Sequence, residues 1–115
     1  MQRKFRLTRS DDFKRVRQSG KSYAHPLLVL VAQAAEPPRV RVGVTAGRTV
    51  GNAVQRNRAK RLLREAMRPS LPFLPPGWDL ILIARPGAVR ATLEEVRAAL
   101  AALLRRASLL PSHES

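Results

Sequence analysis

The sequence has no cysteine and only two histidines, His25 and His113, among its 115 residues. The absence of cysteine excludes a disulfide framework, a thiolate metal site and a cysteine nucleophile. Two distant histidines and one isolated aspartate, Asp79, are too few for a zinc centre or a serine–histidine–aspartate triad. The residue inventory therefore argues against an active site carried by this chain alone.

Long apolar runs are also missing. No segment approaches the roughly 20 consecutive apolar residues of a membrane span, and the basic start MQRKFRLTRS is not followed by the apolar stretch of a secretory signal. We therefore expect a soluble, cytoplasmic protein with no membrane partner. The length suits one domain, which we predict over residues 1–107, with a basic arm over 1–9 and a flexible C-terminal tail over 108–115.

Acidic residues are scarce. Eight Asp and Glu residues stand against 22 Lys and Arg residues, which leaves a formal net charge of +14. Such charges repel one another in a small domain, because the Debye length at physiological salt is about 8 Å. A bound polyanion relieves this repulsion, so nucleic acid is the first candidate partner and an anionic membrane surface is the second.

Three helices are expected from periodicity and capping signals. Residues 10–19 form the first, with Ser10 as a fair N-cap. The second covers residues 52–68, which contain no helix breaker, and the third begins at Thr92, which has the spacing of a capping box with Glu95.

Three strands are expected between these helices. Residues 27–31 and 39–44 are predicted to pair as a hairpin, and residues 79–84, apolar on both faces, are predicted to lie centrally in the sheet. The order α-β-β-α-β-α indicates an α+β fold, a two-layer sandwich of helices against a small central sheet.

The helix predicted over residues 52–68 has charge of one sign on one face. At 100° per residue, its apolar side chains gather on the arc that faces the core, and the opposite arc carries a stripe formed by Asn57, Arg61, Arg64 and Arg68, flanked by Arg58 and Lys60, with Arg56 nearer the apolar edge. Glu65 is the single acid of this helix and follows Arg61 by four residues, so we expect it to relieve part of the repulsion. Solvated faces usually mix charges of both signs, whereas phosphate binding explains a one-sided face. A membrane-surface helix would need its apolar arc for lipid, and here the core uses that arc.

Residues 51–68, GNAVQRNRAKRLLREAMR, resemble the signature helix of the bacterial ribonuclease P protein family. The family's motif reads approximately GNAVxRNRxKRxxRxxxR, and every fixed position is matched. The resemblance extends to DFKRV at 12–16 followed by Gly20, to the strand 40–44 and to IARP at 83–86. It spans most of residues 7–105.

The resemblance implies a protein subunit of an endoribonuclease whose chemistry lies in a large RNA. That RNA, with Mg²⁺ that it holds itself, removes the 5′ leader of precursor tRNA, and one protein per RNA is expected. The family's basic helix meets the RNA subunit. By position, this role falls to Arg56, Asn57, Arg58, Lys60, Arg61, Arg64 and Arg68.

The family also has a cleft between its first helix and its sheet, which binds the single-stranded leader. By resemblance, leader binding falls to Phe13, Arg17 and Arg48. Phe13 could stack on a base, a contact worth ~1–3 kcal/mol, or it could be an ordinary core aromatic. Arg17 replaces a second Phe that many members have, and Gly47-Arg48-Thr49 replaces Ser-Lys-Lys. The cleft is therefore expected to rely on charge more than on stacking.

The fold implied by the resemblance is a ribosomal protein S5 domain 2-like sandwich with a left-handed strand–helix–strand crossover. Without the resemblance we would predict a right-handed crossover, as in about 98% of such connections. The alternative function is a structural RNA-binding protein, such as a ribosomal component, which charge and size fit equally well. A nuclease without RNA would need clustered carboxylates to hold metal, and the acids here are scattered.

Overall fold

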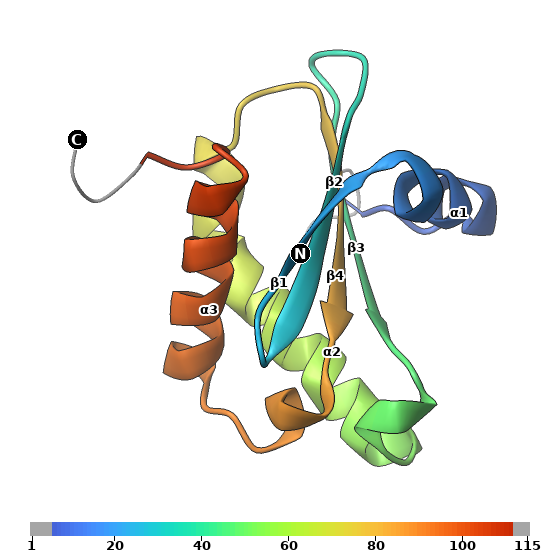
Figure 1. The fold of residues 1–115 in the computed structure, drawn as a ribbon, viewed down its shortest axis with the longest axis vertical. Coiled ribbons are helices and arrows are strands. Elements are labelled where there is room, and N and C mark those ends of the chain that lie inside the picture. Colours follow the sequence, from blue (N-terminus) through green and yellow to red (C-terminus); the bar gives the residue numbers. More distant parts are fainter. Residues whose placement is uncertain (1–5, 112–115) are drawn as a thin grey trace.

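The computed structural model describes residues 6–111, which form a four-stranded sheet with helices on both faces (Figure 1). The strand order is β1-β2-β4-β3. The strands are β1 (Lys21–Ala24), β2 (Leu28–Ala34), β3 (Val40–Ala46) and β4 (Trp78–Ala84). β2 is antiparallel to both β1 and β4, and β3 is parallel to β4. The predicted α+β sandwich is confirmed, with β1 as a strand that the sequence did not reveal.

The helices are α1 (Ser10–Ser19), α2 (Ala53–Met67) and α3 (Leu93–Arg106), with short 3-10 turns η2 (Arg48–Val50), η3 (Arg68–Phe73) and η4 (Pro86–Val89). The predicted capping box of α3 is confirmed. The predicted cap of α1 is wrong, because Arg9 occupies the N-cap position and makes no side-chain cap bond. None of the helices in residues 6–111 is long and apolar enough to cross a membrane.

A capping box also starts α2. Asn52 Oδ1 accepts a hydrogen bond from Gln55 N, and Asn52 N donates to Gln55 Oε1, both at 2.9 Å. Gly51 has a φ of +145°, and a Cβ at that position would collide with the Gln55 side chain. The glycine before Asn52 therefore has a local structural role: it leaves room for the Gln55 side chain to bond back to the Asn52 backbone in the capping box.

The predicted hairpin between the strands now called β2 and β3 is wrong. β4 lies between them, in the central position that the sequence predicted for it, and β2 forms its hairpin with β1. β2 places apolar side chains on both faces, which favours an interior strand with a neighbour on each side. β1 is a short, mostly exposed strand, KSYA, and has no clear alternating pattern.

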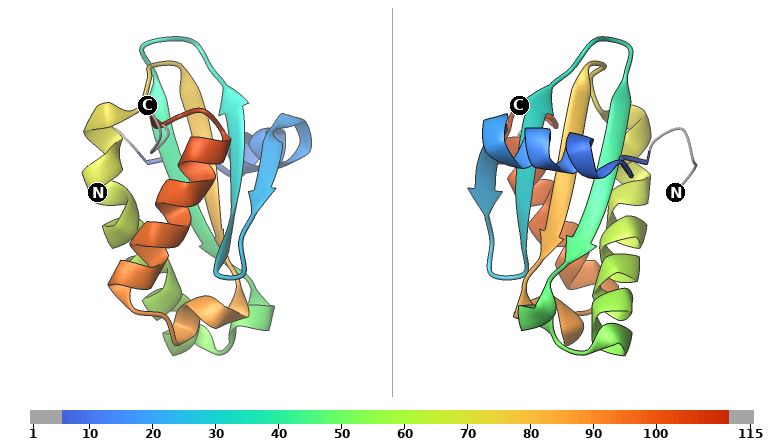
Figure 2. Two further views of the ribbon diagram at one scale, coloured as in Figure 1. Left: turned by 60° about the vertical axis from the view of Figure 1, so that its left-hand side comes forward. Right: turned by 90° about the vertical axis from the view of Figure 1, so that its right-hand side faces the viewer.

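The crossover from β3 through α2 to β4 is left-handed. The right-hand view of Figure 2 looks onto the sheet with α1 in front, and β3 and β4 both run downward with α2 behind them. In that view β4 lies to the left of β3. Seen from the helix side with the strands pointing upward, the chain therefore moves leftward, the rare hand.

The sheet has a large core on one face and a small one on the other. α2 and α3 cover the first, and α1 crosses the second (Figure 2). Leu109 is buried in the larger core, so the tail predicted from residue 108 starts too early; residues 112–115 lie outside the described chain. Part of the predicted basic arm is also packed: Leu7 is 2% exposed and its N–H donates to Val42 O at 2.9 Å. Residues 1–5 of that arm are outside the described part.

Candidate nucleic-acid interface

The basic face of α2 lies on the surface as its periodicity predicts. Ala59, Leu63, Ala66 and Met67 are buried on the opposite arc. Of the seven predicted RNA-binding residues, Asn57, Arg58, Arg61 and Arg68 are exposed, and Arg56, Lys60 and Arg64 are partly buried. The structure therefore presents these side chains along a helix that runs beside the β3 edge of the sheet (Figure 2).

The charges on this face are hardly compensated. Glu65 Oε1 pairs with Arg68 Nη2 at 3.0 Å, and not with Arg61 as predicted. Within residues 6–111, no carboxylate lies within 4 Å of the other five cations of α2. The Arg58 side chain donates a hydrogen bond from its Nε to Val89 O at 3.3 Å. Five guanidinium or ammonium groups thus remain available to an external anion.

Arg64 departs from the simple stripe. It lines a pocket of about 210 Å³ together with Arg6, Thr8 and Phe13 and with the β3 residues Val42 and Val44. Burial lowers the pKa of the Arg64 guanidinium, and the positive charge of Arg6 lowers it further. The α2 face and the surroundings of Phe13 are therefore contiguous: Arg64 belongs to both.

Phe13 serves as a packing residue and also lines this pocket. It is half-buried and, like Val29 and Ile83, packs against the small core under α1. It also lies directly over Gly43, where an added Cβ would come within 2.5 Å of the ring. Gly43 thus permits the close approach of the ring to β3. The two interpretations of Phe13 from sequence are both compatible with this position.

Arg17 and Arg48, the two other predicted leader-binding residues, do not line the Phe13 pocket. Both are exposed, Arg17 in the last turn of α1 and Arg48 in η2, immediately after β3. Any contribution of these two residues to leader binding would therefore be made outside the pocket.

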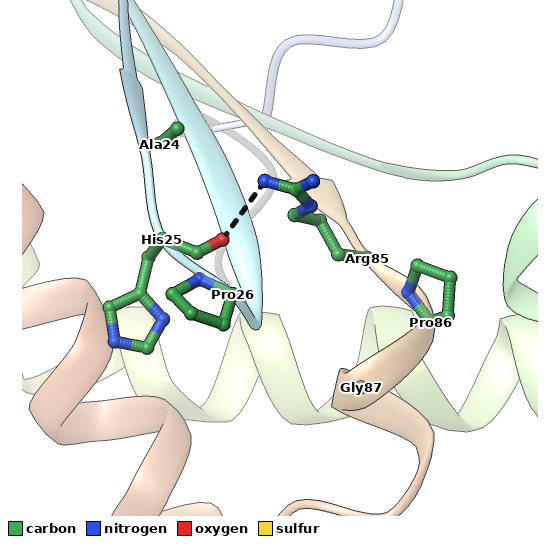
Figure 3. A pocket seen from close by; sticks show the side chains of 6 residues that line it. All are labelled: Ala24, His25, Pro26, Arg85, Pro86 and Gly87. Atoms are coloured by element: carbon green, nitrogen blue, oxygen red, sulfur yellow. Dashed lines mark hydrogen bonds between the residues drawn. The ribbon is translucent and has the colours of Figure 1, made fainter.

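A second pocket lies at the end of β4, next to the segment 83–86 that resembles the family. His25, Pro26, Arg85 and Pro86 are among the residues that line an open pocket of about 570 Å³ (Figure 3). Arg85 Nη1 donates to His25 O at 3.5 Å, and the His25 ring accepts from Leu27 N at 3.0 Å through Nδ1. His25 lies in the connection between β1 and β2.

Sequence reasoning missed the role of Asp79, whose side chain is fully buried under α1. Its carboxylate accepts hydrogen bonds from Arg15, Arg39 and Arg41. Burial alone would raise the pKa of Asp79, and the hydrogen bonds from these three arginines outweigh it, so the pKa is lowered. An acid inside an otherwise apolar strand was the available signal, because a buried carboxylate requires partners.

Comparison with known proteins identifies the family. The family model for ribonuclease P matches residues 1–108. The chain belongs to the ribonuclease P protein family. It is 44% identical to the ribonuclease P protein component of Herpetosiphon aurantiacus over 114 residues, which are 99% of this chain and 93% of that protein. It is 42% identical to that of Chloroflexus aurantiacus over 97% of this chain and 84% of that protein.

Solved structures of the family have the same fold. The Staphylococcus aureus ribonuclease P protein superimposes with a TM-score of 0.80 at 28% identity, covering 93% of this chain and 98% of that one. The Thermotoga maritima protein gives a TM-score of 0.77 at 30% identity, with coverages of 88% and 96%. The family's known role is tRNA 5′ processing, as the protein component of an endoribonuclease complex that has an RNA partner.

Proposed function

We propose that this chain binds the catalytic RNA subunit of ribonuclease P through the basic face of α2, one protein per RNA, in the cytoplasm. The observation that carries the proposal is the set of five cations on one helix without a carboxylate partner among the described residues. A domain with net charge +14 leaves such a face unneutralised only at a cost in repulsion, which RNA phosphates relieve.

We further propose that the 5′ leader of precursor tRNA lies along the α1 side of the sheet, near Phe13. The pocket beside the Phe13 ring provides an aromatic edge, and Arg6 and Arg64 provide positive charge next to it. A single-stranded RNA needs both features, since its bases stack and its phosphates pair with cations. Arg17 on α1 and Arg48 in η2 would add positive charge outside the pocket.

The hydrolytic chemistry is assigned to the RNA subunit, which would hold Mg²⁺. Among residues 6–111, no three His, Asp or Glu side chains lie close enough together to hold a metal ion. A cluster of side chains that could hold a metal ion through the protein alone is therefore not found in this part of the chain. The contribution of the protein is binding and orientation.

The first experiment is cleavage of precursor tRNA at low Mg²⁺ by a bacterial ribonuclease P RNA alone, by this protein alone and by the mixture. The proposal expects cleavage only in the mixture, with a mature 5′ end. Cleavage by the protein alone would reveal an active site within the chain. Binding of the RNA without any gain in cleavage would instead indicate a structural RNA-binding protein.

The helix assignment is tested by Arg61→Ala. Loss of one phosphate contact is expected to weaken assembly with the RNA subunit about tenfold, which corresponds to about 1.4 kcal/mol. The slope of log affinity against log salt should fall by roughly 0.7–0.9. The matched control is Arg105→Ala on α3, which removes the same charge from the neighbouring helix. Equal losses of affinity for the RNA subunit in the two variants would show that binding depends on net charge and not on the α2 face.

A further inference from the structure

The apolar contact that holds α1 on the sheet is small. The core beneath it contains four buried residues, Leu7, Val16, Val31 and Ile81, and Val16 is the one buried residue of the helix itself. Apolar burial is non-directional. A core this small therefore does not determine the angle at which a ten-residue helix crosses the strands. The orientation must come from directional bonds.

Those bonds converge on Asp79, on the α1 side of β4. Arg15 Nη2 donates to its Oδ2 at 2.7 Å, and the Nη1 of the same guanidinium donates to Gln33 Oε1 on β2. From β3, Arg41 Nε donates to Asp79 Oδ1 at 3.2 Å. Arg41 Nη1 also donates to Asp12 Oδ2, on α1, at 3.2 Å. One turn of α1 is thereby tied to three strands.

Phe13 belongs to this same turn, with Asp12 before it and Arg15 two residues after it. Its ring lies over Gly43 of β3 and lines the pocket described above. A guanidinium with two fixed donors allows little rotation or sliding of the helix that carries it. The position of the ring over β3 thus depends on where Asp79 anchors Arg15.

We propose that Arg15, anchored by the buried Asp79 carboxylate, is a positioning residue for the leader: it fixes α1 so that Phe13 presents its ring to the leader. This inference rests on the proposed function. Direct contact between Arg15 and RNA is the less favoured role. Its Nη1 is bonded to Gln33, and its Nη2 is bonded to Asp79 and, at 3.3 Å, to Asp12. The side chain is also only 37% exposed.

The test uses the holoenzyme, reconstituted from this protein and a bacterial ribonuclease P RNA. The measured quantity is leader preference, defined as the ratio of the Kd for a leaderless tRNA to the Kd for the same tRNA with its leader. Phe13→Ala should lower this ratio by about 5- to 150-fold, the loss of one base–aromatic stack. Arg15→Ala should lower it as well, and Lys14→Ala should leave it within about twofold, as expected for an exposed surface change.

The double variant distinguishes positioning from contact. If Arg15 acts through Phe13, Arg15→Ala causes no further loss of leader preference in the Phe13→Ala background. Losses that multiply in the double variant would mean that Arg15 touches the leader itself, and would overturn the proposal. Arg15→Lys keeps a positive charge beside Asp79 but lacks the paired donors of the guanidinium, so an intermediate ratio is expected.

Assembly with the RNA subunit provides the check for folding. It should stay within about twofold of wild type in Arg15→Ala, because α2 packs on the other face of the sheet. A parallel loss of assembly and leader preference would indicate general destabilisation and overturn the positioning role. If wild type prefers the leader and Arg15→Ala shows the same preference, the positioning role is overturned and the proposed function stays intact. Absence of leader preference in wild type would refute the leader assignment itself.

Discussion

Replacing Asp79 by asparagine is expected to be among the most destabilising single changes in this protein. The substitution keeps the shape of the side chain and removes its charge. The carboxylate now accepts four hydrogen bonds from Arg15, Arg39 and Arg41. An asparagine amide would direct its own N–H groups at some of these donors, and three guanidinium groups would lose their central anion.

The magnitude follows from the burial of the cluster. Removing one partner of a buried ion pair costs about 3–5 kcal/mol, because the remaining charge stays without compensation. Here Asp79 is fully buried, whereas the side chains of Arg15 and Arg39 are 37% and 39% exposed, so water compensates part of the loss. We therefore expect the lower end, a decrease of about 3 kcal/mol in the free energy of unfolding.

Urea denaturation, followed by circular dichroism, measures this decrease. With an m value of about 1.5 kcal/mol/M, the midpoint should fall by about 2 M in Asp79→Asn. The matched control is Asp11→Asn, the same chemical change at an exposed acid in the first turn of α1, which should cost less than about 1 kcal/mol. Equal midpoints for the two variants would refute the view that the buried carboxylate holds the α1 side of the sheet together.

Two further predictions concern the same face of the sheet. The pKa values of Asp12 and Asp79 are both lowered in the folded state, the arginine bonds outweighing burial, so the unfolded chain binds more protons in acid. The stabilisation from these two carboxylates should be fully present above their unfolded pKa of about 3.9, and it should be lost as the pH drops through their lower folded pKa values. In Asp79→Asn the free energy of unfolding should fall less steeply with decreasing pH. Parallel curves of the free energy of unfolding against pH for the variant and wild type would contradict this. Gly43→Ala should displace Phe13 and cost about 1–3 kcal/mol, with a loss of leader preference. Gly47→Ala, where a Cβ meets no atom within 4 Å, should be neutral within about 0.5 kcal/mol; equal costs in calorimetry would contradict the role of the ring contact.

Local features of the fold were predictable because they depend on neighbours in sequence. The capping box of α3 and the buried arc of α2 follow from cap residues and from periodicity over a few turns, whereas the N-cap of α1 was predicted one residue too late. Strand pairing was not predictable in the same way. β2 and β3 follow each other along the chain, and only the arrival of β4 between them decides which strands are neighbours.

The candidate site also has features that depend on sequence alone and features that depend on the fold. The cations of α2 were readable residue by residue, since the charge of a side chain does not depend on the fold. The junction at Arg64 was not, because Arg6, Phe13 and Arg64 are far apart in sequence and meet only when α2 packs beside β3. A helical wheel shows the direction of a side chain but not what lies in that direction.

By itself the sequence therefore determined the family, the basic helix and the residue at which that helix starts. The tertiary structure alone decided the order of the strands, the neighbours of Phe13 and the role of Asp79 as a buried anchor for arginines. In the sequence, Asp79 is an isolated acid. In the fold, it is surrounded by Arg15 of α1, Arg41 of β3 and Arg39, which immediately precedes β3. The physical reason is that a buried charge is specified by partners from other elements, whose proximity exists only after the chain has folded.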